Sequence, residues 1–128
     1  MNKGDLTSRL QELGLYSDFY YRKELKALGG LLKDYEQLNA LLTGVQEGNR
    51  KLIAVTDRRI LILFTALGGG DVKVIPRQAV KSWEFHKTLL LFTTLTLETN
   101  GGARFVFTNT QGHLKDRFAW AMNQPLPE

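Results

Sequence analysis

Apolar side chains recur at helical spacing in the first 35 residues. Leucines from Leu6 to Leu13 lie three and four residues apart, and Gly14 follows where a glycine commonly ends a helix. A second helix is predicted from Asp18 to Leu28, stopped by the pair Gly29-Gly30. We therefore expect an N-terminal helical extension over residues 1–35, made of one or two short helices.

After Tyr35 the apolar positions alternate with polar ones, which is the period of a strand buried on one face. Turn residues separate the alternating runs, most clearly at Asp57-Arg58 and Asn100-Gly101-Gly102. Seven strands are predicted, at Leu38–Val45, Lys51–Thr56, Arg59–Thr65, Val72–Ile75, Val80–Lys87, Leu89–Thr99 and Arg104–Thr108.

The last part of the chain returns to helical spacing. Asn109 or Thr110 can cap a helix that runs to about Asn123, and Pro125 follows its end. The strands and this helix predict a mainly β, α+β domain over residues 36–124, namely a seven-stranded antiparallel barrel or sandwich capped by a C-terminal α-helix. The residues expected on the buried face of that helix are Leu114, Phe118, Ala121 and Met122.

The composition is that of an ordinary globular protein, with 43% hydrophobic and 23% charged residues among 128. It includes no cysteine, which excludes disulfides, thiolate metal sites and thiol nucleophiles. Residues 1–37 carry equal numbers of acidic and basic side chains, so the net charge of +4 comes from residues 38–128. Such a charge suits attraction to phosphate groups or anionic lipids, and equally a solvated surface that is slightly basic.

No targeting signal is visible at the N-terminus. The longest apolar runs, such as Ile60–Phe64, are far shorter than the ~20 residues that span a bilayer. We therefore expect a cytoplasmic domain, with a peripheral position at a membrane surface as the alternative.

No group of residues has the spacing of a catalytic or metal site. The two histidines, His86 and His113, lie in a predicted strand and at the start of the last helix, without the short spacing of metal ligands. The run Gly68-Gly69-Gly70 lacks the Gly-Lys-Ser/Thr of a phosphate-binding loop and precedes Asp71. We predict a protein that is no enzyme and takes no metal and no cofactor.

From Lys23 to about residue 123 the chain resembles the bacterial pleckstrin-homology (PH) domains, in particular the YokE-like group. The most specific element is the hairpin LIAVTDRRILIL at Leu52–Leu63. The resemblance implies two nearly orthogonal sheets of four and three strands, capped by the C-terminal helix. The other matching elements are ELKALGGLLKDYE at Glu24–Glu36, a glycine at Gly44 ending the first strand, Ile75-Pro76 before VKSWEF at Val80–Phe85, the hairpin at Leu95–Phe107, and the closing helix with Phe118 and Trp120.

Some of these residues also have structural reasons to be present. Thr56 and Asp57 can hydrogen-bond the backbone of the turn between two core strands. Trp120 can supply a large apolar face that closes one end of the barrel. Arg58 and Arg59 are then either turn surface or one side of a basic rim.

Lipid-binding domains of the wider PH group resemble one another in a lysine on the first strand and a Lys/Arg-x-Arg on the second. Here Leu38–Val45 has no basic residue, so a specific inositol-phosphate pocket is not expected. An anionic membrane surface is attracted only if several basic residues share one face. The candidates for that face are Arg50, Lys51, Arg58, Arg59, Lys73 and Arg77.

The pattern and the resemblance favour a non-catalytic interaction module. It would bind a protein or peptide, or a second copy of itself, through a sheet edge, a barrel loop or the N-terminal aromatic helix. In that helix Tyr16, Phe19 and Tyr20 are the candidate partner contacts, with packing onto the domain as their alternative use. Nucleic-acid binding is the least favoured hypothesis, because the aromatic residues of the strands suit the core: Phe64, Phe92, Phe105 and Phe107.

Overall fold

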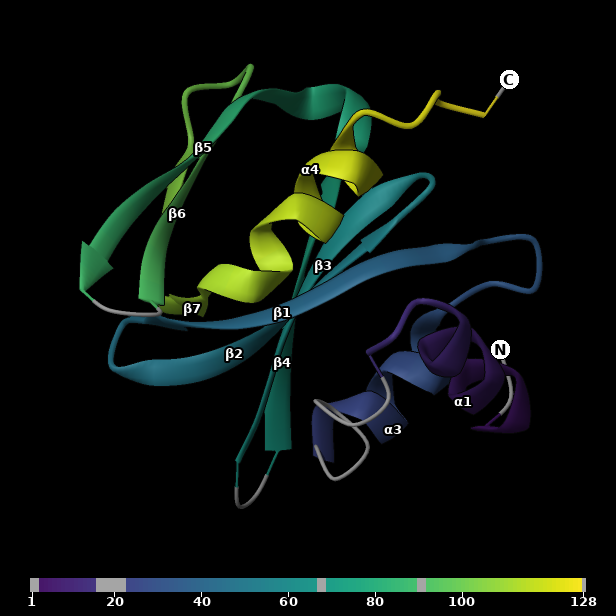
Figure 1. Cartoon of the computed structure of the whole chain (residues 1–128). Coiled ribbons are helices and arrows are strands. Elements are labelled where there is room, and N and C mark those ends of the chain that lie inside the picture. The colour runs from purple at the N-terminus through teal and green to yellow at the C-terminus, as the bar shows by residue number, and fades with distance from the viewer. Residues whose placement is uncertain (1–2, 16–22, 67–68, 90–91, 128) are drawn as a thin grey trace.

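The computed structural model describes residues 3–15, 23–66, 69–89 and 92–127 (Figure 1). Two helices come first, α1 (Lys3–Glu12) and α3 (Lys23–Leu31). The strands are β1 (Leu38–Gln46), β2 (Asn49–Thr56), β3 (Arg59–Ala66), β4 (Gly69–Pro76), β5 (Val80–Leu89), β6 (Phe92–Thr99) and β7 (Arg104–Gln111). A 3₁₀ helix, η1 (Arg77–Ala79), joins β4 to β5, and a second, η2 (Gly112–Leu114), leads into α4 (Lys115–Met122).

The seven strands form one antiparallel sheet in the order β4-β3-β2-β1-β7-β6-β5. Successive hairpins connect β1 to β4 and β5 to β7, and the two groups meet where Val45 of β1 pairs with Thr108 of β7. The sheet therefore has a half of four strands and a half of three, and α4 lies against it (Figure 1). The predicted PH-like fold with a C-terminal helix and N-terminal helices is confirmed, but the two expected sheets are joined into one by the pairing of β1 with β7.

The N-terminal helices occupy the predicted region with different ends. Helix α3 continues through Gly29 and Gly30, so the predicted stop at this pair is wrong. Leu28 and Leu32 on either side are buried in the core, and their packing offsets the low helix propensity of glycine. The part of the predicted second helix before Lys23 lies outside the described residues. No helix in the described part of the chain is long and apolar enough to cross a membrane.

Helix α1 packs on the strands that follow it. Leu6 and Leu10 are buried members of the hydrophobic core. Between them Arg9 donates to the Leu38 carbonyl oxygen at 2.7 Å and to the Asn39 side-chain oxygen at 2.9 Å. The start of β1 is therefore attached to α1 by hydrogen bonds as well as by apolar contact.

The hairpin between β5 and β6 differs from the prediction. β5 extends to Leu89 and β6 begins at Phe92, so the predicted strand Leu89–Thr99 is divided between two strands. Phe92 is exposed at the start of β6, whereas Phe107 of β7 is fully buried. The prediction that Phe92 belongs to the core is therefore wrong.

Strand β7 is longer than predicted, so the last helix begins later in the chain than expected. Asn109 and Thr110 belong to β7, so neither residue caps the helix. Thr110 is buried, and its hydroxyl donates to the Thr93 carbonyl oxygen at 2.8 Å. This cross-strand bond holds the segment in the sheet, and α4 begins only after the 3₁₀ turn at Gly112–Leu114.

Phe118 is the aromatic residue of α4 that closes the core. It is fully buried, and its ring meets those of Trp83 and Phe85 edge to face, with centroid separations of 5.6 and 5.4 Å. Trp120 is 41% exposed, so the prediction that it closes the barrel is wrong. Two residues along a helix turn by about 200°, which sends Trp120 away from the face that buries Phe118.

Gly44 lies inside β1 rather than at its end, at the place where β7 crosses it. A Cβ atom there would lie 2.7 Å from the Phe107 Cβ and 2.9 Å from the Thr110 Cγ2. We expect Gly44→Ala to lower the free energy of unfolding by about 2 kcal/mol, because both neighbours are buried and close to their own backbones. Urea denaturation monitored by circular dichroism measures this loss.

Gly30→Ala is the matched control for that variant. Gly30 is a helical glycine whose added Cβ meets nothing within 4 Å. The substitution is expected to be neutral or to stabilise the protein by up to about 1 kcal/mol. Equal stability of Gly44→Ala and the wild type would contradict the close approach of β7 to β1.

Candidate functional site

Arg50 and Lys51 lie at the beginning of β2 and bond within the protein. Arg50 donates to the Thr43 hydroxyl at 2.7 Å and to the Asn109 carbonyl oxygen at 3.2 Å. Lys51 donates to the Gln46 side-chain oxygen at 2.9 Å. Arg50 therefore connects β2 to β1 and β7, close to the junction of the two half-sheets.

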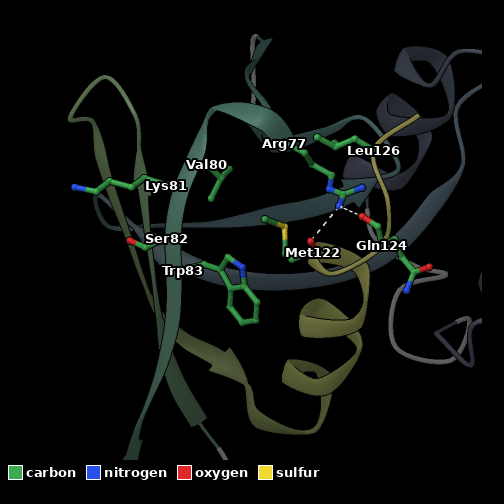
Figure 2. Close-up of a pocket in the computed structure, with 8 residues that line it drawn as sticks. All are labelled: Arg77, Val80, Lys81, Ser82, Trp83, Met122, Gln124 and Leu126. Atoms are coloured by element: carbon green, nitrogen blue, oxygen red, sulfur yellow. Dashed lines mark hydrogen bonds between the residues drawn. The ribbon is translucent and has the colours of Figure 1, made fainter. Parts of the chain in front are cut away.

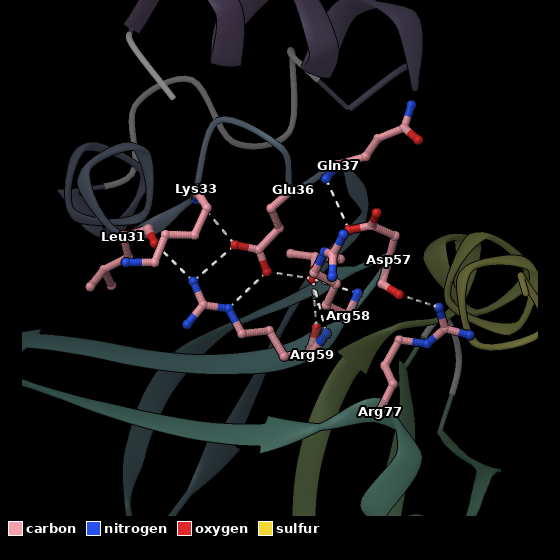
Figure 3. Close-up of polar contacts among 9 residues, drawn as sticks. Leu31, Lys33, Glu36, Gln37, Asp57, Arg58, Arg59 and Arg77 are labelled. Atoms are coloured by element: carbon pink, nitrogen blue, oxygen red, sulfur yellow. Dashed lines mark hydrogen bonds and ion pairs between the residues drawn. The ribbon is translucent and has the colours of Figure 1, made fainter. Parts of the chain in front are cut away.

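The turn between β2 and β3 contains a buried network around Glu36 (Figure 3). Arg59 donates hydrogen bonds to both carboxylate oxygens of Glu36, at 2.7 and 2.9 Å, and to the Leu31 carbonyl oxygen at 2.8 Å. The Thr56 hydroxyl donates to Glu36 at 2.7 Å and accepts the Arg58 and Arg59 backbone amides. The predicted bonding of Thr56 to the turn backbone is confirmed, and Arg59 is the link between this turn and α3.

Opposing effects act on the pKa of Glu36. Burial raises the pKa of this carboxyl, but hydrogen bonds from Arg59, Thr56 and the Lys33 amide, together with the charge of Arg59, outweigh it. The net result is a pKa below the ordinary glutamate value, so Glu36 is ionised in the folded protein at neutral pH. The same ion pair raises the pKa of Arg59.

The remaining predicted cations lie apart from the first two. Arg58 stacks over the exposed Tyr35 ring at 4.6 Å, and Lys73 lies 5.9 Å from the Phe105 ring centroid. Arg77 follows β4 and donates to the Asp57 carbonyl oxygen, which brings it to the β2–β3 turn (Figure 3). Arg58, Arg59 and Arg77 thus gather at one end of β2, while Arg50 and Lys51 lie at the other end.

The aromatic candidates Tyr16, Phe19 and Tyr20 lie outside the described residues. His86 forms an exposed pair with Glu84, with 2.6 Å between the ring Nε2 and the carboxylate. No three metal-ligating side chains gather anywhere in the described ranges.

A groove of about 440 Å³ lies between β5 and the end of α4 (Figure 2). One wall consists of four consecutive residues of β5, Val80–Trp83. Successive strand residues point to opposite faces, so a hollow lined by four in a row follows the edge of the strand. The opposite wall consists of Met122, Gln124 and Leu126, and Arg77 lies at one end.

Arg77 is the buried charge of this groove. It is 7% exposed and donates to the carbonyl oxygens of Met122 and Gln124 (Figure 2) and of Asp57 (Figure 3). Arg77 therefore ties the C-terminal tail, residues 123–127, and the end of α4 to the β2–β3 turn. Its Nε has no hydrogen-bond partner in the described part of the protein. Burial lowers the pKa of Arg77, and the nearby Asp57 carboxylate opposes that effect.

Sequence reasoning placed Arg77 on a basic surface and did not identify the groove. A β-bulge on β5 adds to its shape, since Val80 pairs with Thr99 and Ser82 with Glu98, which leaves Lys81 as the extra residue. The only local signal is the run Ile-Pro-Arg before β5, because a proline often ends a strand. The residues of the other wall, Met122, Gln124 and Leu126, have no comparable local signal in the sequence.

A seven-stranded antiparallel sheet of four and three strands, closed by a C-terminal helix, defines a PH-like domain. The sequence model of the family described as bacterial PH domain matches residues 32–122. The chain belongs to this bacterial PH domain family, whose domains are generally non-catalytic. A search of curated proteins finds no match.

The fold is also similar to a solved structure, the C-terminal domain of an unknown protein from Leishmania infantum. The TM-score is 0.54 at 15% sequence identity, and the match covers 84% of this chain and 96% of that one. At this level of identity the similarity shows the shared fold alone.

Proposed function

We propose that this domain is an interaction module that binds an extended peptide segment of a partner protein along the edge of β5. The observation that carries the proposal is the groove between β5 and the C-terminal end of α4. β5 is the last strand of the sheet order, so its outer edge offers backbone amides and carbonyls to an added strand. The volume falls within the range of about 300–1,000 Å³ that is usual for ligand sites.

The side chains of the groove suit such a segment. Trp83, Met122 and Leu126 supply apolar contacts from both walls, and Leu126 is 46% exposed. A peptide strand beside β5 directs alternate side chains toward these residues. Backbone hydrogen bonds would then give affinity and the apolar contacts selectivity.

The proposal is tested by selecting binders from a phage-displayed library of random peptides with the full chain. Amide shifts in ¹H–¹⁵N spectra then locate the selected peptides, and we expect them along β5 and the tail. Leu126→Asp is expected to weaken binding by about tenfold or more, because it places a carboxylate in the apolar wall.

Val74→Asp on β4 is the matched control, since Val74 is a comparably exposed apolar residue on the opposite edge of the sheet. It is expected to change the affinity less than about twofold. Shifts confined to β4, or equal losses in both variants, would overturn the assignment to β5.

The alternatives predict other results in the same preparation. Self-association through the β4 edge, with Val72 and Val74 exposed, would appear as a dimer in light scattering. Binding to anionic vesicles would have to use the six predicted cations, and it would disappear as salt is raised. The distribution of those cations over both ends of β2 favours the peptide over the membrane.

Two finer assignments complete the proposal. We place the chain in the YokE-like group, on the hairpin Leu52–Leu63. We also treat residues 1–35 as a helical extension and 36–124 as the PH-like domain, which places the peptide groove within the latter except for its Leu126 end.

A further inference from the structure

We infer that the groove beside β5 binds a carboxylate of the peptide at Arg77, with Lys81 attracting it from the outer side of the strand (Figure 2). This inference rests on the proposed peptide binding and names the chemistry of the segment recognised. The carboxylate comes either from an Asp or Glu side chain or from the C-terminus of the bound segment. The groove would thus select acidic segments that also carry an apolar side chain.

The groove is positively charged. Among the described residues, its lining includes two cations, Arg77 and Lys81, and no acidic side chain. Neither cation forms an ion pair within the described residues. A carboxylate entering here therefore meets positive charge, and the acidic group that acts on Arg77 within the described part of the chain is Asp57 at the β2–β3 turn.

Arg77 has a buried hydrogen-bond donor without an acceptor in the described part of the protein. Its three acceptors are neutral backbone carbonyls, and its Nε donates to nothing in the described protein. A buried donor without an acceptor costs free energy. A carboxylate that binds here supplies the missing acceptor.

The geometry of the guanidinium sets a condition on binding. The Nε and one Nη of an arginine form a fork that matches the two oxygens of a carboxylate. In Arg77 the Nη2 of that fork is held by the carbonyl oxygens of Met122 and Gln124. A carboxylate that engages the fork replaces the Gln124 carbonyl, so binding is coupled to release of the tail from Arg77.

The bulge on β5 affects where the second cation lies. Lys81 is the extra residue of this strand, and its exposed side chain points to the outer side of β5, away from Arg77 (Figure 2). Its ammonium therefore attracts an approaching carboxylate by its charge and does not hold it in the groove. Lys81 would then act mainly on association, and Arg77 on the bound state.

The test uses the selected peptides in matched pairs. Each Asp or Glu is replaced by Asn or Gln in one arm, and the C-terminal carboxylate is replaced by an amide in the other. Loss of the recognised carboxylate is expected to weaken binding by about tenfold or more. The arm that shows the loss identifies the source of the carboxylate.

Two protein variants accompany these peptides. Lys81→Glu is expected to weaken the acidic peptide by about tenfold and to leave the neutral analogue nearly unchanged. Lys87→Glu is the control, because Lys87 is an exposed lysine further along the same strand. The Arg77 Nε–H resonance and the Leu126 amide are expected to shift with the acidic peptide only.

The outcomes separate the two proposals. If peptides bind along β5 and their neutral analogues bind equally well, the carboxylate site is wrong and the peptide groove remains. If no selected peptide shifts the amides of β5, both are wrong. If Lys81→Glu and Lys87→Glu weaken the affinity for the acidic peptide equally, the effect of charge is a general electrostatic attraction, and the proposed carboxylate site is wrong.

Discussion

Phe118→Ala is expected to lower the free energy of unfolding by about 4 kcal/mol. The Phe118 side chain is fully buried, and its ring contacts those of Trp83 and Phe85 edge to face. Removing it leaves a cavity between α4 and β5, where the Trp83 and Phe85 rings lose their contacts with Phe118 and keep only the contact with each other. Thermal and urea denaturation measure the loss, with the near-ultraviolet spectrum of Trp83 as a local report.

Trp120→Ala is the control on the same helix. Trp120 is half-exposed, and its ring contacts the Arg117 guanidinium at 5.1 Å. We expect a loss of about 1 kcal/mol or less, because little of the core is removed. A larger loss for Trp120→Ala than for Phe118→Ala would mean that the tryptophan closes the sheet after all.

Glu36→Gln is expected to cost about 3 kcal/mol at neutral pH. The substitution leaves Arg59 beside an amide, in a site where the side chain of Glu36 is 1% exposed. It removes the charge that binds Arg59 and accepts the Thr56 hydroxyl and the Lys33 amide. Urea denaturation of both proteins across a pH series checks the value and its pH dependence.

The sign of the pH dependence follows from the lowered pKa of Glu36. In the unfolded chain this carboxyl titrates near its ordinary value, about 4.3. The stabilisation from the carboxylate is therefore complete above that pH and is lost as the pH falls through the lower folded-state pKa. The stability difference between wild type and Glu36→Gln is expected to be constant near neutrality and to shrink in acid.

Glu12→Gln provides the control for the ion pair. Glu12 pairs with Arg9 at 3.0 Å, but its side chain is 66% exposed. Solvent screening keeps such a pair to about 0.5 kcal/mol. A difference between wild type and Glu36→Gln that does not change with pH would contradict the ionised state of Glu36 in the folded protein.

The strands were predictable because turn residues separate short runs that either alternate, as in β6, or are continuously apolar, as in β2 and β3. The Thr56 hydroxyl at the turn between β2 and β3 accepts backbone amides, as its position suggests. The errors lie where distant residues override local signals. Gly29 and Gly30 stay helical because their neighbours are buried, and Thr110 stays in the sheet because of Thr93.

The candidate site was less accessible to sequence reasoning. A list of cations does not show which of them already have partners, and Arg50, Lys51 and Arg59 all bond within the protein. Arg77 appears in the sequence as one more surface charge. Its burial depends on the end of α4 and the tail that follows, because the carbonyl oxygens of Met122, 45 residues later, and of Gln124 accept its hydrogen bonds.

The sequence by itself determined the classes of structure and chemistry open to this protein. Alternation and helical spacing specify the strands and helices, and a chain without cysteine excludes thiol chemistry. Only the tertiary structure decided where β5 becomes an edge, which charge is buried and where a groove forms. These features arise from contacts between segments that are far apart in the sequence. Local patterns of side chains do not reveal such contacts.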